Sequence, residues 1–185
     1  MTRYWYDTEF IEDGRTIDLI SIGIVADDGR EYYAVNLDAP WKRIYKHDWL
    51  MENVVPSLPR YYGDARNHFG NKVNLDDPTC RTYAKIRADV KDFLVGPFAD
   101  APREVDLWAW YGAYDHVALA QMFGPMVNLP SGIPMWTNDL RQECHRLGLD
   151  AEVIAPRTGG HHNALEDARW NRDLHAAIVR EVTGE

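Results

Sequence analysis

The sequence has few cysteines and lacks any long apolar run. Its two cysteines, Cys80 and Cys144, are far apart and match no zinc-ligand spacing, so we expect reduced, partly buried thiols. No apolar segment approaches the roughly 20 residues that a membrane-spanning helix needs. The N-terminus runs directly into an expected strand, without the pattern of a secretory signal. We therefore expect a cytoplasmic protein with no membrane partner.

Basic residues are also scarce. There are 20 lysines and arginines against 29 aspartates and glutamates, which gives a formal net charge of −9. Proteins that coat long nucleic-acid duplexes are usually basic, because the release of counterions from phosphates drives binding. The charge argues against that class of protein, although not against an enzyme that holds a few nucleotides through bound cations. An acidic surface that only maintains solubility is the alternative explanation.

Length and composition indicate one globular domain. The chain has 185 residues, 45% hydrophobic and 12% aromatic, which is enough for a single packed core and excludes a disordered tail. The sequence contains no internal repeats and no interdomain linker. We predict a single domain over residues 1–185, with an irregular insertion at about 38–77 that contains a short helix at 48–55.

The first third of the chain reads as three consecutive strands. Residues 4–6 open the first strand, 17–26 form a long β-branched run, and 31–36 follow the turn signal Asp27-Asp28-Gly29. With no helix between them, these strands predict an antiparallel meander.

Strands and helices alternate in the rest of the chain. The expected elements are a helix from Asp77-Pro78 to about Leu94, a strand at 105–110, a helix at 114–123, a short strand at 135–137, a helix capped by Asn138 or Asp139 and ending at Gly148, and a last helix at 163–182. This order predicts an α/β fold with a mixed sheet, in which parallel strands extend the meander and helices flank it. A ribonuclease-H-like sheet fits, whereas a doubly wound parallel fold would need helices between the first strands.

Two acids near the end of the first strand suggest a metal site. Asp7 and Glu9 are two residues apart, so their side chains project from the same face of the strand. Close carboxylates repel each other unless a cation lies between them, and Mg²⁺ or Mn²⁺ prefers such oxygen ligands. Two solvated acids at a strand end would be the simpler interpretation.

Three further residues are individually weak signals. Asp115 lies at a helix start, where interaction with the helix dipole would explain it. His162 precedes the last helix as a loop residue beside glycines, and Asp167 lies one turn inside that helix. Together with Asp7 and Glu9 they form the ordered pattern D-x-E, D, H-x4-D, with each member at a strand end or helix start.

This pattern resembles the DEDDh exonucleases, a branch of the ribonuclease-H-like superfamily. His162, and not its neighbour His161, gives the four-residue gap to Asp167 that the family motif requires. The segment 38–77 matches nothing in the family pattern. A closer resemblance to the small actinobacterial-type 3′→5′ exoribonucleases, sometimes described as polyadenylate-specific, lies in the stretches 6–12, 107–110 and 112–116.

The resemblance implies a reaction and a set of roles. Asp7, Glu9, Asp115 and Asp167 would hold two Mg²⁺ ions, for which Mn²⁺ could substitute, and His162 would take the proton from the attacking water. The substrate would be RNA with a single-stranded 3′ end, and the products nucleoside monophosphates. The resemblance also allows a homodimer.

Aromatic and polar neighbours of these residues are expected to contact the substrate. Phe10 lies just beyond Glu9 and could stack on a base, an interaction worth about 1–3 kcal/mol per base. Thr8 and Trp110 complete the expected contacts, with Trp108 as an alternative, although tryptophans on a central strand are more often core. Two further acids are interpreted as surface charge: Glu12 and Asp139.

Three alternative functions remain open from the sequence. A DEDDh exonuclease acting on DNA would carry the same motifs, because sugar discrimination depends on contacts to the 2′-hydroxyl. A non-catalytic nucleic-acid-binding module of the same fold would have no need for clustered acids that repel phosphate. A phosphohydrolase of free nucleotides would not need a 3′ strand end.

Overall fold

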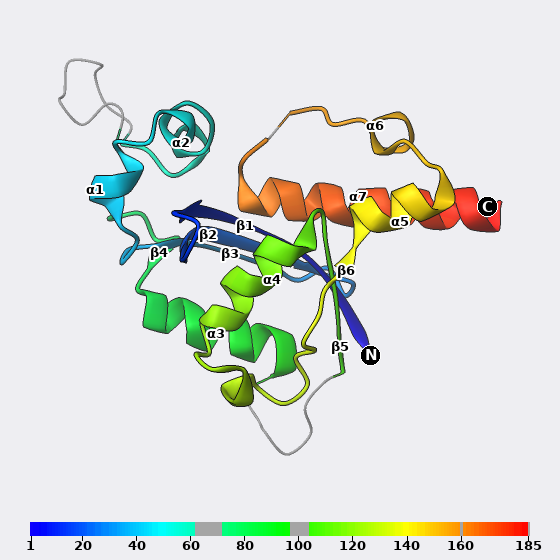
Figure 1. The fold of residues 1–185 in the computed structure, drawn as a ribbon, viewed down its shortest axis with the longest axis horizontal. Coiled ribbons are helices and arrows are strands. Elements are labelled where there is room, and N and C mark those ends of the chain that lie inside the picture. The colour runs from blue at the N-terminus through cyan, green and yellow to red at the C-terminus, as the bar shows by residue number, and fades with distance from the viewer. Residues whose placement is uncertain (62–71, 97–103, 160, 185) are drawn as a thin grey trace.

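Six strands form one mixed sheet in the order β4-β3-β2-β1-β5-β6, with helices on both faces (Figure 1). The structure is a computed structural model and describes residues 1–61, 72–96, 104–159 and 161–184. The strands are β1 (Thr2–Glu12), β2 (Ile17–Ala26), β3 (Glu31–Asn36), β4 (Cys80–Arg81), β5 (Val105–Ala109) and β6 (Asn138–Asp139). The helices are α1 (Trp41–Ile44), α2 (Asp48–Asn53), η1 (Val55–Ser57), α3 (Tyr83–Val95), α4 (Gly112–Gln121), η2 (Met126–Asn128), α5 (Leu140–Leu147), α6 (Ala151–Ile154) and α7 (Ala164–Thr183).

The first three strands form the predicted antiparallel meander. β1 pairs with β2 and β2 with β3, both antiparallel, whereas β4, β5 and β6 each join the sheet in parallel. This arrangement confirms the predicted mixed α/β sheet. The register between β1 and β2 shifts at Glu9/Phe10, next to the acidic residues of β1. Such bulges re-aim the side chains that follow them.

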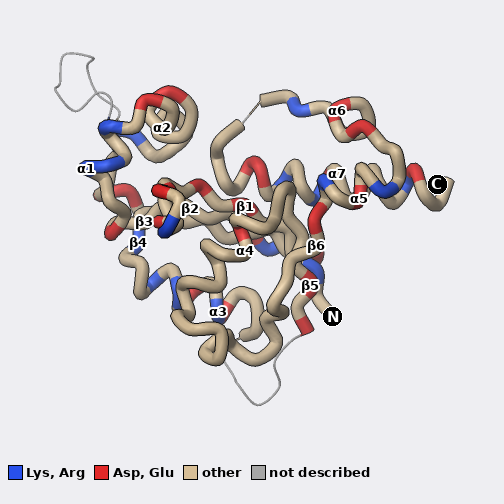
Figure 2. The backbone as a smooth tube through the Cα atoms, in the orientation of Figure 1, with Lys and Arg blue, Asp and Glu red and all other residues tan. Residues whose placement is uncertain are grey.

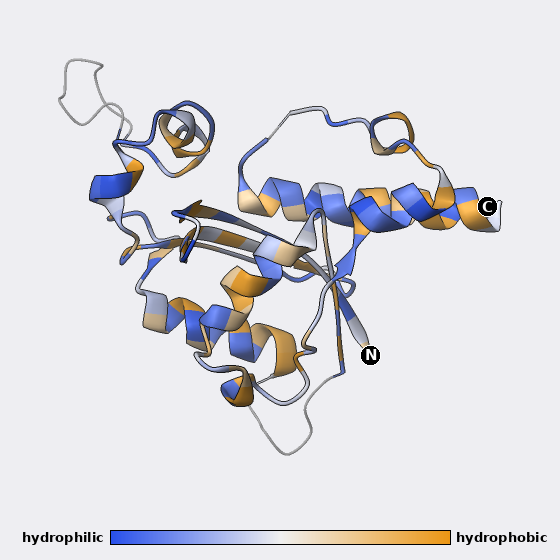
Figure 3. Ribbon diagram, in the orientation of Figure 1, coloured by the Kyte–Doolittle hydropathy of each residue, from blue (hydrophilic) through white to orange (hydrophobic). Residues whose placement is uncertain are grey.

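Alternation along β1 divides the core between the two faces of the sheet. Tyr4 and Tyr6 are fully buried in the cluster that includes residues of α3 and α4, whereas Trp5 faces α7 with Ala168. The ribbon shows α7 and α5 on one side of the sheet and α3 and α4 on the other (Figure 1). Each long helix carries an apolar stripe beside a polar one (Figure 3), as expected for helices that cover a sheet.

The start of α7 lies unusually close to the sheet. A Cβ atom at Gly23 of β2 would fall 2.3 Å from the backbone of Ala164, the first residue of α7. Asn163 caps this helix, and its side chain accepts hydrogen bonds from the backbone N–H groups of Leu165 and Glu166. Only glycine at position 23 permits this approach, which brings the first turns of α7 over the acidic end of β1.

The described part of the segment 38–77 contains three short helices. The short helix expected at 48–55 is present as α2, and α1 and η1 flank it. Buried side chains from these helices, including Ile44, Leu50 and Val55, pack with Ile11, Ile20 and Val35 of the sheet as a separate core cluster. Residues 62–71 of this segment lie outside the described part of the chain.

Two predictions of element position are wrong. The helix expected from Asp77 begins at Tyr83, because Asp77 instead closes a turn by accepting hydrogen bonds from Thr79, and residues 80–81 pair with β3. The strand expected at 135–137 lies at Asn138–Asp139, where the chain pairs with β5.

The helix starts are otherwise close to expectation. Tyr111 has a positive φ of 55° and turns the chain, so α4 begins at Gly112 rather than at 114. Asp139 caps α5, as predicted, and Gly148 ends that helix in the left-handed conformation.

Cys80 and Cys144 are both free and buried. Within the described residues, no helix has the length and apolarity needed to cross a membrane.

The contact between Gly23 and α7 leads to a stability prediction. Replacing Gly23 by alanine should lower the free energy of unfolding by about 3 kcal/mol or more, because the added methyl group would collide with helix backbone that cannot rotate away. Urea denaturation followed by circular dichroism would measure the change.

Gly29→Ala is the matched control for this prediction. A Cβ at Gly29 meets no atom, so this variant should lose only about 1 kcal/mol through its positive φ of 86°. Equal losses in the two variants would show that the close approach of α7 is not what fixes Gly23.

Candidate active site

Three of the four predicted carboxylates meet at one point. Asp7 and Glu9 project from the same face of β1, and Asp167 reaches them from the first turn of α7. Each offers one oxygen atom, and the three atoms lie within 4.8 Å of one another. Acidic positions of β1 and of the beginning of α7 come together near the centre of the molecule (Figure 2). The cluster is a direct consequence of the tight packing of α7 on the sheet.

Asp115 approaches the cluster from α4 and is held by β1. Its Oδ1 atom accepts hydrogen bonds from the backbone N–H of Thr8, at 2.8 Å, and from the Thr8 hydroxyl, at 2.6 Å. Asp115 is 6% exposed and Thr8 5% exposed. The Thr8 hydroxyl and backbone N–H thus position Asp115, while the predicted contact of Thr8 with substrate stays a prediction.

Burial and mutual repulsion make Asp7 and Glu9 hard to ionise. Burial raises the pKa of Asp7 well above its ordinary value, and the charges of Asp115, Glu9 and Asp167 raise it further. Burial also raises the pKa of Glu9, followed by the charges of Asp167 and Asp115. A set of desolvated carboxylate oxygens with raised pKa values is a donor set that fits a hard divalent cation such as Mg²⁺ or Mn²⁺.

Arg157 supplies positive charge to the cluster, and sequence reasoning missed it. Its guanidinium Nη1 donates to Oδ1 of Asp167, and the two side chains are 15% and 9% exposed. The guanidinium also lies over the indole of Trp170, 3.7 Å from the ring centroid. Arg157 lies in the loop between α6 and α7, where no periodicity or motif marks it, so no sequence signal could have identified it.

His162 lies at the mouth of the carboxylate cluster. Its Nδ1 atom is 4.0 Å from Oε1 of Glu9, and its side chain is 38% exposed. Burial lowers the pKa of His162, although the charge of Asp167 opposes this shift, so the imidazole is neutral at neutral pH. His161 is exposed. The structure thus brings His162 to the carboxylates, in agreement with the spacing of the motif.

The segment 38–77 holds the loop that carries His162. The hydroxyl of Ser57 donates to the carbonyl oxygen of His162, and the side chain of Asn163 donates to the carbonyl oxygen of Ser57 at 3.1 Å. Trp49 of α2 contacts the His162 ring edge-on, with ring centroids 5.0 Å apart. His162 has a positive φ of 62°, a conformation that a non-glycine residue keeps only when its surroundings hold it. Sequence analysis gave no role to Trp49 or Ser57.

The aromatic residues predicted to bind bases have different surroundings. Phe10 stacks on Tyr114, with centroids 6.1 Å apart, and Tyr114 is 59% exposed. Trp110 packs edge-on against Trp170 at 5.2 Å, and Trp108 stacks on a buried histidine. Both tryptophans therefore make packing contacts, while the base contacts of Phe10 and Trp110 stay predictions.

The two acids interpreted as surface charge differ from each other. Glu12 accepts a hydrogen bond from Gly14 in an exposed turn, which agrees with that interpretation. Asp139 instead accepts hydrogen bonds from the backbone N–H groups of Gly112 and Gln142, so it joins the starts of α4 and α5. Its interpretation as simple surface charge is wrong.

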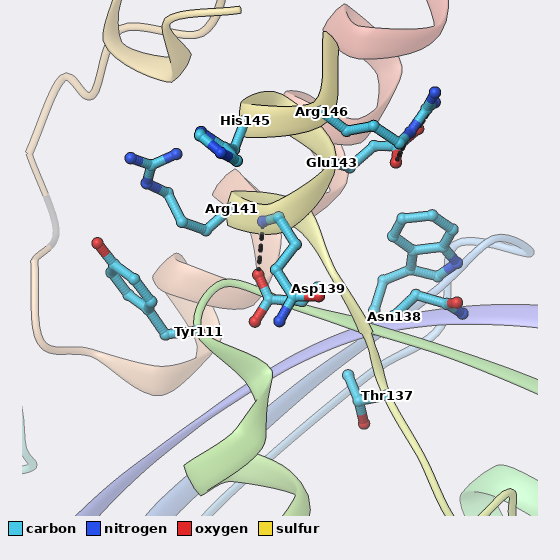
Figure 4. A pocket seen from close by; sticks show the side chains of 10 residues that line it. Tyr111, Thr137, Asn138, Asp139, Arg141, Glu143, His145 and Arg146 are labelled. Atoms are coloured by element: carbon cyan, nitrogen blue, oxygen red, sulfur yellow. Dashed lines mark hydrogen bonds and ion pairs between the residues drawn. The ribbon is translucent and has the colours of Figure 1, made fainter. Parts of the chain in front are cut away.

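A hollow of about 880 Å³ lies beside this junction, between α5 and the end of β5. Side chains of Arg141 and His145 extend over it from α5, opposite Tyr111 (Figure 4). None of the clustered carboxylates lines this hollow. The candidate active site is therefore defined by the carboxylates and not by this hollow.

Comparison with known proteins gives a consistent result. The model of the 3′-5′ exoribonuclease Rv2179c-like domain matches residues 64–179, a range that includes Asp115, His162 and Asp167 but begins after β1. Two curated relatives from Mycobacterium tuberculosis, named 3′-5′ exoribonuclease Rv2179c (strain ATCC 25618 / H37Rv) and 3′-5′ exoribonuclease MT2234.1 (strain CDC 1551 / Oshkosh), are each 44% identical to the chain over 167 residues. The alignment covers 90% of this chain and 87% of each relative. The chain therefore belongs to the 3′-5′ exoribonuclease Rv2179c-like family.

Proposed function

We propose that the protein is a metal-dependent 3′→5′ exoribonuclease of the DEDDh type, built on a ribonuclease-H-like fold. The observation that carries the proposal is the meeting of Asp7, Glu9 and Asp167, with His162 4.0 Å from Glu9. The names of the relatives support exonucleolytic action on RNA. The mixed six-stranded sheet with helices on both faces is compatible with the fold.

The four carboxylates would together hold two divalent ions. Asp7, Glu9 and Asp167 would hold one ion, and Asp115 would assist Asp7 with the other. When bound, two such ions would supply the positive charge that activates a water molecule and neutralises the phosphate and the leaving oxygen. Thr8 fixes the direction of Asp115 through two hydrogen bonds, so this carboxylate is oriented before substrate arrives.

His162 is the proposed general base. Its Nδ1 atom faces Glu9, so a water held at the carboxylates would transfer its proton to this nitrogen. The lowered pKa keeps the ring neutral and able to accept a proton. Ser57 and Trp49 keep the ring at the mouth of the site through contacts with its backbone and its edge.

The substrate would enter with its 3′ end first and leave as nucleoside 5′-monophosphates. Phe10, stacked with the exposed Tyr114 beside Asp115, would support a terminal base. A DEDDh enzyme acting on DNA is the second candidate. A non-catalytic binding module is disfavoured, since clustered carboxylates repel phosphate, and a hydrolase of free nucleotides would act on mononucleotides alone.

The central test is a digestion ladder with RNA labelled at its 5′ end. We expect shortening by one nucleotide at a time in Mg²⁺, arrest by EDTA, and slower cleavage of DNA of the same sequence. Asp7→Asn should reduce cleavage at least about a thousandfold, because the cluster loses a shared charged ligand. Faster cleavage of DNA would favour the second candidate, and full turnover by Asp7→Asn would exclude the proposed metal site.

His162→Ala should separate catalysis from metal binding. Loss of a general base typically reduces turnover about 10²–10⁴-fold, while the carboxylates that hold the ions remain intact. Single-turnover cleavage and Mn²⁺ binding measured by calorimetry would be compared in the same preparation. A parallel loss of Mn²⁺ affinity would identify His162 as a ligand and not as a base.

The raised carboxyl pKa values predict that the metal-free protein loses stability as pH rises. The pKa of Glu9 is raised to about 8, so between its ordinary value and pH 8 the folded state binds a proton that the unfolded state has released. This contribution is present at low pH and is lost as pH rises through that window. Thermal unfolding in EDTA should show a fall in the melting temperature between pH 5.5 and 8 that is smaller in Glu9→Gln.

Divalent cations should reverse the destabilisation at pH 8, because they bind the ionised carboxylates of the folded state only. An identical pH profile for wild type and Glu9→Gln would rule out burial of an ionisable Glu9.

A further inference from the structure

Arg157 is buried against an acid that the proposed function assigns to metal binding. Within the described residues, it is the only lysine or arginine whose side chain lies within 4.0 Å of a carboxylate oxygen of Asp7, Glu9, Asp115 or Asp167. Burial raises the pKa of Asp7, and the positive charge of Arg157 opposes that rise. A guanidinium therefore contributes the positive charge that a desolvated carboxylate cluster requires.

A second contact holds Arg157 independently of Asp167. The guanidinium lies 3.7 Å from the centroid of the Trp170 indole, a cation–π arrangement. Trp170 follows Asp167 by three positions, so the two side chains lie side by side on α7. The indole N–H donates to the carbonyl oxygen of Ala155 at 2.8 Å and thereby fixes the ring to the loop that carries Arg157. Arg157 can thus leave Asp167 without leaving the site.

We propose that Arg157 has two successive partners: Asp167 in the metal-free protein, and the phosphate of the nucleotide once divalent ions are bound. The inference rests on the proposed function. An ion held by Asp167 would repel the guanidinium, and a phosphate at the same place would attract it. Arginine suits both partners, because its planar fork pairs with carboxylates and phosphates alike. Arg157 is therefore an internal competitor of the metal and a residue that binds the substrate.

Arg157→Gln is the informative substitution, and Arg141→Gln is its matched control. Arg141 also lies over an indole, at 6.0 Å from the centroid of Trp110, and Trp110 itself contacts Trp170. Arg141 extends over the separate hollow (Figure 4) and has no ion pair with a carboxylate of the cluster. Thermal unfolding with and without Mn²⁺ would verify that both variants fold.

The first measurement is Mn²⁺ binding to the metal-free proteins by calorimetry at pH 8. We expect Arg157→Gln to bind Mn²⁺ several-fold more tightly than wild type, because the ion no longer displaces a guanidinium. Arg141→Gln should bind like wild type. Unchanged or weaker Mn²⁺ binding by Arg157→Gln would overturn the competition.

The second measurement compares AMP with adenosine in the presence of Ca²⁺. Arg157→Gln should weaken AMP binding about tenfold to a hundredfold, the loss expected for one charge-assisted hydrogen bond, and leave adenosine binding unchanged. Equal effects on both ligands would overturn the phosphate contact. If wild type binds Mn²⁺ and degrades RNA, but Arg157→Gln changes neither the Mn²⁺ affinity nor the AMP affinity, this inference fails and the proposed function stands. If wild type binds no divalent ion, both fail.

Discussion

Burial of several like charges at one point is the constraint on which the site depends. Asp7, Glu9, Asp115 and Asp167 come from three different elements and are largely removed from water, so each ionised group raises the free energy of the others. Specific hydrogen-bond and ion-pair partners offset part of this repulsion. Two hydrogen bonds from Thr8 support Asp115, and the guanidinium of Arg157 supports Asp167. These contacts hold the carboxylates in place but do not neutralise all of their negative charge, so the cluster still favours the binding of cations.

Sequence reasoning could identify the carboxylates because their positions follow from local rules. Asp7 and Glu9 share a face through strand alternation, and Asp167 lies one turn inside a helix whose start the sequence predicts at residue 163. The meander and the capped helices could be predicted for the same reason. The starts of α3 and β6 could not, because side-chain turns and pairing with distant strands decide them. At Asp77, for example, a hydrogen bond that its carboxylate accepts from Thr79 prevails over the preference for a helix start.

The supporting residues could not be predicted, since their roles arise only from contacts across the chain. Ser57 and Trp49 contact the His162 loop although they are distant from it in the sequence. Arg157 pairs with Asp167 from a loop without periodicity. No sequence signal marks the role of Gly23 either, although this residue decides how closely α7 can approach β2. The carboxylates proposed as metal ligands can thus be predicted from local spacing. The residues that hold them in place are determined by tertiary contacts and cannot be predicted in this way.

The acidity of the protein and its proposed polyanionic substrate can be reconciled by the same electrostatics. With a net charge of −9 and a cluster in which the carboxylates outnumber the guanidinium of Arg157, the one guanidinium paired with them among the described residues, the metal-free protein should repel RNA. In the proposed mechanism, divalent ions would reverse the sign of the potential at the site itself, where the scissile phosphate would lie, and would leave the rest of the surface acidic. Binding of RNA and binding of the ions would then be thermodynamically coupled, so that each would increase the affinity for the other by the same factor. An acidic surface also disfavours attachment along internal stretches of a polymer. Attraction confined to one small cationic site favours an enzyme that takes the end of a strand over one that coats its length.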